Sequence, residues 1–144
     1  MLKSTLVSFN NALDKDDLGK LILRIAVGGL LLFHGWHKLV DGIGGVQAML
    51  VAHGIPAFVG YGVLVGEVIA PILIIFGVLT RPAALVMAAT MVVAWLLVGL
   101  GKTFVLSPVG SWAIEDIVYF FLAAIAISLL GCGRYSICSN PYWR

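Results

Sequence analysis

The sequence has few charged residues for its length. Asp, Glu, Lys and Arg together make up 11% of the 144 residues, whereas hydrophobic residues make up 61%. Soluble domains contain about 25% charged and about 45–50% apolar residues. The mean hydropathy is correspondingly high, at +1.08. This composition excludes an ordinary soluble domain and predicts an integral membrane protein whose main partner is the lipid bilayer.

Basic charge is scarce as well and is not clustered. The Lys and Arg residues exceed the Asp and Glu residues by only two, which gives a formal net charge of +2. Nucleic-acid binding requires a basic stripe or patch, and the sequence has none. We therefore expect no nucleic-acid partner.

Cysteine is nearly absent, since Cys132 and Cys138 are the only two. Without a neighbouring His or further Cys they lack the four ligands of a structural zinc site. They could form a disulfide or redox pair, whereas free thiols are expected if they face a reducing cytosol. The sequence also lacks haem, flavin and iron–sulfur motifs, so an electron carrier would have to be a quinone or come from a partner protein.

Most of what remains is apolar and long enough for helices that span a membrane. A hydrocarbon core of roughly 30 Å needs about 20 helical residues, so the chain has room for four spans and little else. The predicted fold class is an all-α membrane protein, a four-transmembrane-helix bundle. A polar segment, 1–17, precedes the transmembrane domain, 18–130, and a tail, 131–144, follows it. The spans are predicted at about residues 18–40, 57–79, 82–100 and 112–130.

The predicted links between the spans are short. Residues 46–53 could form an amphipathic helix at the interface between the first two spans. Thr80 and Arg81 are nearly all that separates the second span from a third that begins at Pro82, which forces an antiparallel hairpin. Ser111 is expected to cap the N-terminus of the fourth span.

Lys and Arg are divided unevenly between the two sides of the predicted bundle. With four spans both termini lie on one side, which receives six Lys and Arg residues at or beyond the span ends, against two on the other side. The positive-inside rule then places both termini in the cytoplasm. Arg81 is interpreted as one of the anchors that set this orientation.

One carboxylate lies near the middle of the second span. Glu67 is the only charged residue between 57 and 79. An ionisable side chain at this depth costs at least about 2.5 kcal/mol, so it normally faces the bundle interior, has a partner and marks a functional site. It lies on the flank of a small-residue seam, Gly62, Gly66 and Ala70, that favours close helix packing.

Depth estimates indicate which groups Glu67 could meet. With a rise of about 1.5 Å per residue, Glu67 lies about 19 Å from the cytoplasmic end of its span, and His34 about 24 Å from that of the first span. We therefore expect His34 as its first partner. Arg24 lies about 10 Å below Glu67 on the same scale, so a water-mediated contact or a direct ion pair is an alternative.

Other polar residues are expected at the outer end of the bundle. His34, His37 and Lys38 can share one helical face, and Glu115 and Asp116 begin the fourth span. With the buried carboxylate they predict a cluster suited to a proton relay or to anchoring a polar ligand. Structural interpretations stay open: Lys38 can snorkel, the two acids favour a helix dipole, and the histidines can simply pack. A divalent metal fits these residue types, but His-x-x-His spacing is common and no metal site is predicted.

Four blocks of the sequence stand in a characteristic order and spacing. They are Phe33-His34-Gly35-Trp36-His37-Lys38-Leu39, His53-Gly54-Ile55-Pro56, Gly77-Val78-Leu79-Thr80-Arg81-Pro82-Ala83-Ala84 and Gly131-Cys132-Gly133-Arg134-Tyr135-Ser136. With Glu67 as the acidic position of the second span, they resemble the DoxX family of small bacterial and archaeal membrane proteins from Leu21 to Ser136. Where that family's terminal pattern commonly continues to Asp, this sequence has Cys138.

The resemblance implies a multi-pass protein of the bacterial inner (plasma) membrane. Relatives are associated with the membrane subunit of an archaeal thiosulfate:quinone oxidoreductase and with a mycobacterial membrane oxidoreductase complex in thiol and oxidative-stress balance. The expected function is therefore that of a subunit of a redox or thiol-stress complex, either non-catalytic or quinone-interacting. On this hypothesis it works with oxidoreductase partner proteins and is not catalytic alone.

Two other functions fit the same residues. A small-molecule or lipid transporter, or an accessory to one, would use Glu67 to bind a proton or a polar headgroup, and with only four helices it would need a homo-oligomer. An assembly or stability factor would use its buried polar groups only to specify helix packing.

Overall fold

Three helices of the computed structural model, which describes residues 2–143, are long and apolar enough to cross a membrane. They cover Asp16–Asp41, Ala57–Phe76 and Thr80–Lys102. These bounds agree with the first three predicted spans to within a few residues. Within the described residues the structure is helical, apart from one isolated antiparallel bridge between Leu106 and Trp112, and contains no sheet. The chain is therefore an all-helical, multi-pass membrane protein.

The first span is one regular helix, whereas the second is interrupted. Helix α2 covers Asp16–Asp41, and its two leading aspartates complement the positive end of the helix dipole. The second span consists of a 3₁₀ turn (Ala57–Gly60), α4 (Tyr61–Leu64), a π-helical turn (Val65–Ile69) and α5 (Ala70–Phe76). The π-helical turn contains Glu67, so the helix is widened where its buried carboxylate lies.

Pro71 explains the position of this wider turn. A proline has no N–H to donate, and in a regular α-helix its ring clashes with the carbonyl four residues earlier, here that of Glu67. A π-helical turn moves that carbonyl away from the ring. Such turns occur mostly as single insertions and often at functional sites.

The hairpin between the second and third spans lies earlier than predicted. Gly77 ends α5 in a left-handed conformation, with φ 75°, and Leu79 follows with φ 47°. Helix α6 (Thr80–Ala94) then begins at once, followed by a second π-helical turn (Trp95–Gly99) and a 3₁₀ turn (Leu100–Lys102). The predicted link, Thr80 and Arg81, is thus the first turn of α6, because the glycine already provides the reversal.

The last helix, α7 (Glu115–Leu130), begins later than predicted and is shorter than the other three. Ser111 does not cap it. Instead, the hydroxyls of Ser107 and Ser111 lie 2.7 Å apart, and Ser107 N–H donates to the Ser111 carbonyl at 2.7 Å. The link closes on itself around these serines, so Trp112 cannot start the helix. A fourth span stays a prediction.

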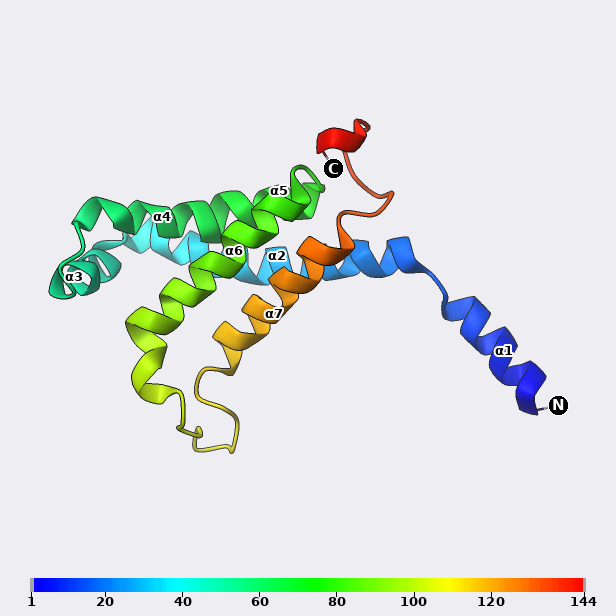
Figure 1. Ribbon diagram of the computed structural model, residues 1–144, viewed down its shortest axis with the longest axis horizontal. Coiled ribbons are helices and arrows are strands. Elements are labelled where there is room, and N and C mark those ends of the chain that lie inside the picture. Colours follow the sequence, from blue (N-terminus) through cyan, green and yellow to red (C-terminus); the bar gives the residue numbers. More distant parts are fainter. Residues whose placement is uncertain (1, 144) are drawn as a thin grey trace.

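Two shorter helices lie at the ends of the bundle. Helix α3 (Gly44–Ala52) matches the helix predicted at 46–53 and packs on the 3₁₀ turn before α4, with Leu50 buried. Helix α1 (Leu2–Leu13) forms within a segment predicted only to be polar. It extends away from the bundle (Figure 1). The side chains of Phe9 and Leu13 in this helix are exposed.

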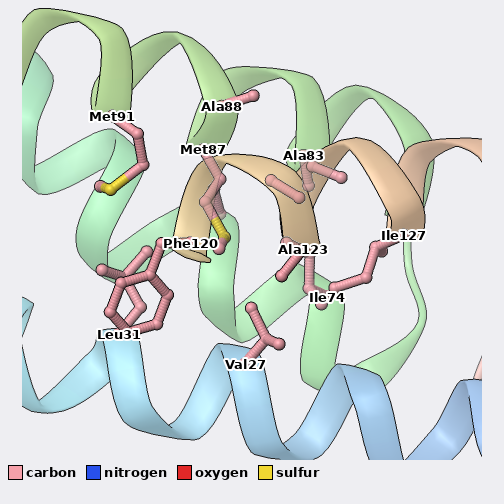
Figure 2. Packing of buried hydrophobic residues seen from close by; sticks show 13 residues of the cluster. Val27, Leu31, Ile74, Ala83, Met87, Ala88, Met91, Phe120, Ala123 and Ile127 are labelled. Atoms are coloured by element: carbon pink, nitrogen blue, oxygen red, sulfur yellow. The ribbon is translucent and has the colours of Figure 1, made fainter. Parts of the chain in front are cut away.

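The core lies where four helices meet. Small residues, including Ala84 of α6 and Ala124 of α7, are fully buried and let these two helices approach closely. Figure 2 shows larger side chains filling the space around them: Val27 and Leu31 from α2, Ile74 from α5, Met87 and Met91 from α6, and Phe120 and Ile127 from α7.

The outer surface is apolar as well. Phe33 of α2, Ile69 of the π-helical turn and Leu122 of α7 are each more than half exposed. Soluble monomers rarely expose apolar surface on this scale, whereas lipid-facing helices do. The surface thus agrees with the hydropathy of the sequence.

Candidate functional site

Glu67 forms an ion pair with Lys38 in the interior of the protein. Glu67 is only 4% exposed, and Lys38 Nζ lies 2.5 Å from each of its carboxylate oxygens. The Lys38 side chain is itself mostly buried. Because an isolated charge at this depth is expensive, the ammonium group provides the compensation that the carboxylate requires.

His34, the predicted first partner, is not the residue that pairs with Glu67. Its ring packs edge-on against Phe120 of α7, with the ring centroids 5.8 Å apart. The depth estimate compared Cα positions and ignored the length and direction of side chains. Side chains on a helix point back toward its N-terminus, so the long Lys38 side chain can extend from the last turn of α2 to Glu67.

Close contact between α2 and the π-helical turn holds the pair together. A Cβ at Gly35 would lie 2.2 Å from the Glu67 carbonyl oxygen, so a glycine is required there. Pro71 has no N–H to donate to this carbonyl oxygen. The oxygen faces the Cα of Gly35, which can offer a weak Cα–H···O contact instead. Lys38 follows Gly35 by three residues and therefore lies on the same face of α2.

Helix α6 approaches the same turn from the other side. A Cβ at Gly66 would lie 1.8 Å from Thr90 Oγ1, and Ala70 is 2% exposed, so these two members of the predicted seam do pack closely. Gly62 does not, because a Cβ there would meet nothing within 4 Å. Gly62 lies in α4, before the π-helical turn, and lines an apolar cavity together with Thr90 of α6 instead of touching that helix.

The ion pair borders an apolar cavity of about 160 Å³. A second cavity of about 260 Å³ shares much of its lining, including Val63, Thr90 and Val93. Val46 of α3 lines both. An ammonium group has three N–H donors, and Glu67 accepts only two of those of Lys38. Among the described residues the third has no partner, so the site combines apolar walls with one spare, charged donor.

Arg24 is buried but serves another part of the molecule. It is 1% exposed and donates from Nε to the Ile74 carbonyl at 2.8 Å and from Nη2 to the Ile75 carbonyl at 2.8 Å. Nη1 donates to the carbonyls of Cys132 and Tyr135. The guanidinium therefore caps the end of α5 and fastens the C-terminal tail, and the expected contact with Glu67 does not form.

The rest of the predicted outer cluster is dispersed. His37 Nδ1 lies 2.6 Å from Asp41, one turn further along α2, and both side chains are exposed. Glu115 and Asp116 are exposed in the first turn of α7, and within residues 2–143 no hydrogen bond or ion pair links them to Glu67. Of the predicted cluster, the structure brings together only Lys38 and Glu67.

The cysteines and the remaining candidate ligands are likewise not grouped. Cys132 is buried and Cys138 half-buried, and both are free thiols. Across the described part of the chain, no three His, Cys, Asp or Glu side chains are close enough together to hold a metal ion.

Several residues that shape the site were not predicted. Gly35 and Thr90 belong to helices far from Glu67 in the sequence, and nothing local marks their contacts. Pro71 did provide a signal, because a proline four residues after a buried acid frees that residue's carbonyl and predicts an irregular turn. Val46 of α3 lines the cavities beside Glu67 only because the segment between the first two spans folds back against the 3₁₀ turn at Ala57–Gly60. This packing could not be predicted from the local sequence.

Comparison with known proteins gives one family and one relative. The family model described as DoxX matches residues 19–100, which is more than half of the chain. The "Putative oxidoreductase CatD" of Bacillus subtilis (strain 168) is 31% identical over 88 residues, which cover 61% of this chain and 65% of that protein. The match thus spans slightly less than two thirds of the relative. No solved structure matches the chain.

Proposed function

The chain belongs to the DoxX family of membrane proteins, and from this premise we propose that it is the quinone-interacting membrane subunit of a redox complex. The observation that carries this proposal is the Lys38–Glu67 ion pair at the wall of an apolar cavity. A buried charge pair that only linked two helices would need no open space beside it.

The chemistry of the cavity matches that of a quinone. A quinone ring is flat and apolar and carries carbonyl acceptors, so it fits apolar walls with one donor. The spare N–H of Lys38 would bind a ring carbonyl, and Glu67 would hold the ammonium group in position. The adjoining 260 Å³ cavity would take the first part of the isoprenoid tail.

The proposal also implies a partner protein that supplies electrons. The relative's name refers to an oxidoreductase, and this sequence has no motif for a resident electron carrier. On this proposal the chain holds the quinone and an oxidoreductase partner delivers the electrons. The chain is then not catalytic by itself.

We also propose the orientation of the subunit. Helix α7 would serve as the fourth span of a bundle in the bacterial plasma membrane, with both termini in the cytoplasm. Support comes from the excess of Lys and Arg on the side of the termini and of the hairpin at Gly77. The ion pair would then lie in the outer half of the membrane.

The test compares single and double substitutions at the ion pair. Lys38→Met or Glu67→Gln leaves one charge buried, which costs about 3–5 kcal/mol, whereas replacing both charges with apolar side chains is often neutral. The double variant Lys38→Met/Glu67→Met should therefore fold and yet lose quinone. The measurement is exchangeable quinone retained by protein purified in native lipid, quantified by mass spectrometry, with Lys102→Met as the control at an exposed lysine.

Two outcomes would contradict the proposal. If the double variant keeps as much quinone as the wild type, the ion pair acts only in helix packing, as in an assembly factor. If the wild type itself carries no exchangeable quinone in native lipid, the cavity has another occupant.

A further inference from the structure

Another cavity lies at the opposite end of the bundle from Glu67, where α2 begins and α7 ends. Its volume is about 340 Å³, and its lining consists of Arg81, Leu130, the backbone segment from Gly131 to Gly133, and Pro141. This cavity shares no residue with the two beside Glu67. It therefore needs an explanation of its own.

Within the described residues, one complete edge of the Arg81 guanidinium group has no hydrogen-bond partner. Nη1 donates to the carbonyls of Ser128, at 2.7 Å, and Leu129, at 3.0 Å, at the end of α7. In the described chain, Nε and Nη2 have no hydrogen-bond partner. A Cβ at Gly131 would lie 3.1 Å from Nη2, so the guanidinium lies close against a glycine backbone at the cavity wall.

The free edge has the geometry that recognises a phosphate. Nε and Nη2 carry two parallel N–H groups, which match two non-bridging oxygens of a phosphate or phosphodiester. The surrounding charge is mixed but includes further basic groups. Lys20 lies against Gly133, and Asp17, also beside Gly133, already accepts a hydrogen bond from the Arg134 N–H at 3.0 Å.

The setting of the cavity favours a lipid over a free ion. Pro141 is followed by Tyr142, which is 92% exposed, and by Trp143, which is also exposed. Exposed Tyr and Trp at a helix-bundle end are typical of the headgroup level of a bilayer. Leu130, partly exposed at the end of α7, offers apolar surface for the start of an acyl chain. Basic pockets at this depth are known sites for anionic headgroups.

We propose that Arg81 and the Gly131–Gly133 segment form a binding site for the phosphodiester headgroup of an anionic phospholipid. The two Nη1 bonds fix the guanidinium on the end of α7, and its free edge binds the phosphate. This site is independent of the quinone proposal, because it uses different residues at the other end of the bundle.

The test measures how much phosphatidylglycerol stays bound to the full-length protein. Delipidated protein in mild detergent is titrated with phosphatidylglycerol, phosphatidylcholine or inorganic phosphate, and retained lipid is counted by native mass spectrometry. Arg81→Gln should weaken retention of phosphatidylglycerol by about fivefold or more, since one basic side chain near the headgroups contributes roughly that much. Arg81→Lys keeps the positive charge but loses the pair of parallel N–H groups, so its retention of phosphatidylglycerol should lie between that of the wild type and that of Arg81→Gln.

A second variant separates binding from folding. Arg81→Gln also removes the bonds to the end of α7, whereas Pro141→Trp adds bulk at the cavity and leaves those bonds intact. Both should retain less phosphatidylglycerol than the wild type, whereas Lys15→Gln, which removes a charge at the same end but outside the cavity, should retain as much as the wild type. Equal retention by Lys15→Gln and Arg81→Gln would overturn the proposal, as would full retention by Pro141→Trp. Displacement of the lipid by millimolar inorganic phosphate would overturn the assignment to a lipid.

Discussion

Gly35 allows the close approach of two helices on which the Lys38–Glu67 ion pair depends. It has no side chain to offer, yet its missing Cβ is what lets α2 touch the Glu67 carbonyl and brings Lys38 within hydrogen-bonding distance of the carboxylate. Gly28, two turns earlier, has a similar role against Ile75 of α5. The ion pair therefore depends on a backbone contact as much as on its two charges.

This dependence gives a prediction at the residue scale. In an open helix, Gly→Ala usually stabilises by roughly 0.5–1 kcal/mol. At Gly35 the added Cβ overlaps backbone that cannot move aside, so Gly35→Ala should instead destabilise by about 1–3 kcal/mol. The measurement is thermal unfolding in detergent.

Gly29 provides the matched control on the same helix. A Cβ there would meet nothing within 4 Å, so Gly29→Ala should be neutral or slightly stabilising. If both variants unfold at the same temperature, the close contact at Gly35 does not hold the two spans together.

At the scale of elements, the C-terminal tail is fastened to the bundle at several points. Arg24 binds its carbonyls at Cys132 and Tyr135, and Ser136 Oγ donates to the Gly77 carbonyl at 2.8 Å. The Leu79 N–H also donates to the Trp143 carbonyl, at 2.7 Å. The tail therefore closes over the α5–α6 hairpin, as the red segment in Figure 1 shows.

The loss of Arg24 should release this tail. Arg24→Gln removes two of these bonds, those to the carbonyls of Cys132 and Tyr135, and each bond to a charged donor contributes about 1.5–3 kcal/mol. Trypsin should then cleave after the exposed Arg134 about tenfold faster, because the local opening that cleavage needs becomes more populated. The measurement is the rate at which the peptide after Arg134 appears in mass spectra.

Cleavage elsewhere shows whether the effect is local. Lys15→Gln, on the same side of the bundle, should leave the rate at Arg134 unchanged. If Arg24→Gln speeds cleavage after Lys38 as much as after Arg134, the substitution has unfolded the bundle and the role in fastening the tail is wrong.

At the scale of the whole molecule, the orientation of the bundle can be checked by labelling. Phe104 lies in the α6–α7 link and is fully exposed, whereas Cys138 lies in the tail. With α7 across the membrane, an impermeant maleimide should label Phe104→Cys, in a Cys138→Ser background, in intact cells. The native Cys138 should react only after the membrane is made permeable.

The alternative topology gives the opposite pattern. If α7 does not cross, the link and the tail lie on the same side, and both cysteines react under the same condition. That result would contradict the four-span prediction and leave the three spans that the helices support.

The sequence by itself determined the class of protein and the place of its unusual charge. In lipid, a hydrophobic run of about 20 residues can hydrogen-bond all its backbone N–H and C=O groups only as a helix. Three spans and the depth of Glu67 therefore follow from composition and spacing. Gly77 in a left-handed turn and Pro71 four residues after Glu67 are also local features. They can be recognised without knowing what packs against them.

The tertiary structure decided which groups meet. Depth alone favours His34, and Lys38 lies one helical turn further along α2. The direction of α2 side chains and the contact at Gly35 are what select Lys38. Arg24 could have paired with the carboxylate but instead binds carbonyls contributed by α5 and the tail. Depth along a helix depends on a rise per residue, which the sequence contains, whereas the rotation and approach of helices depend on contacts between residues far apart in the chain.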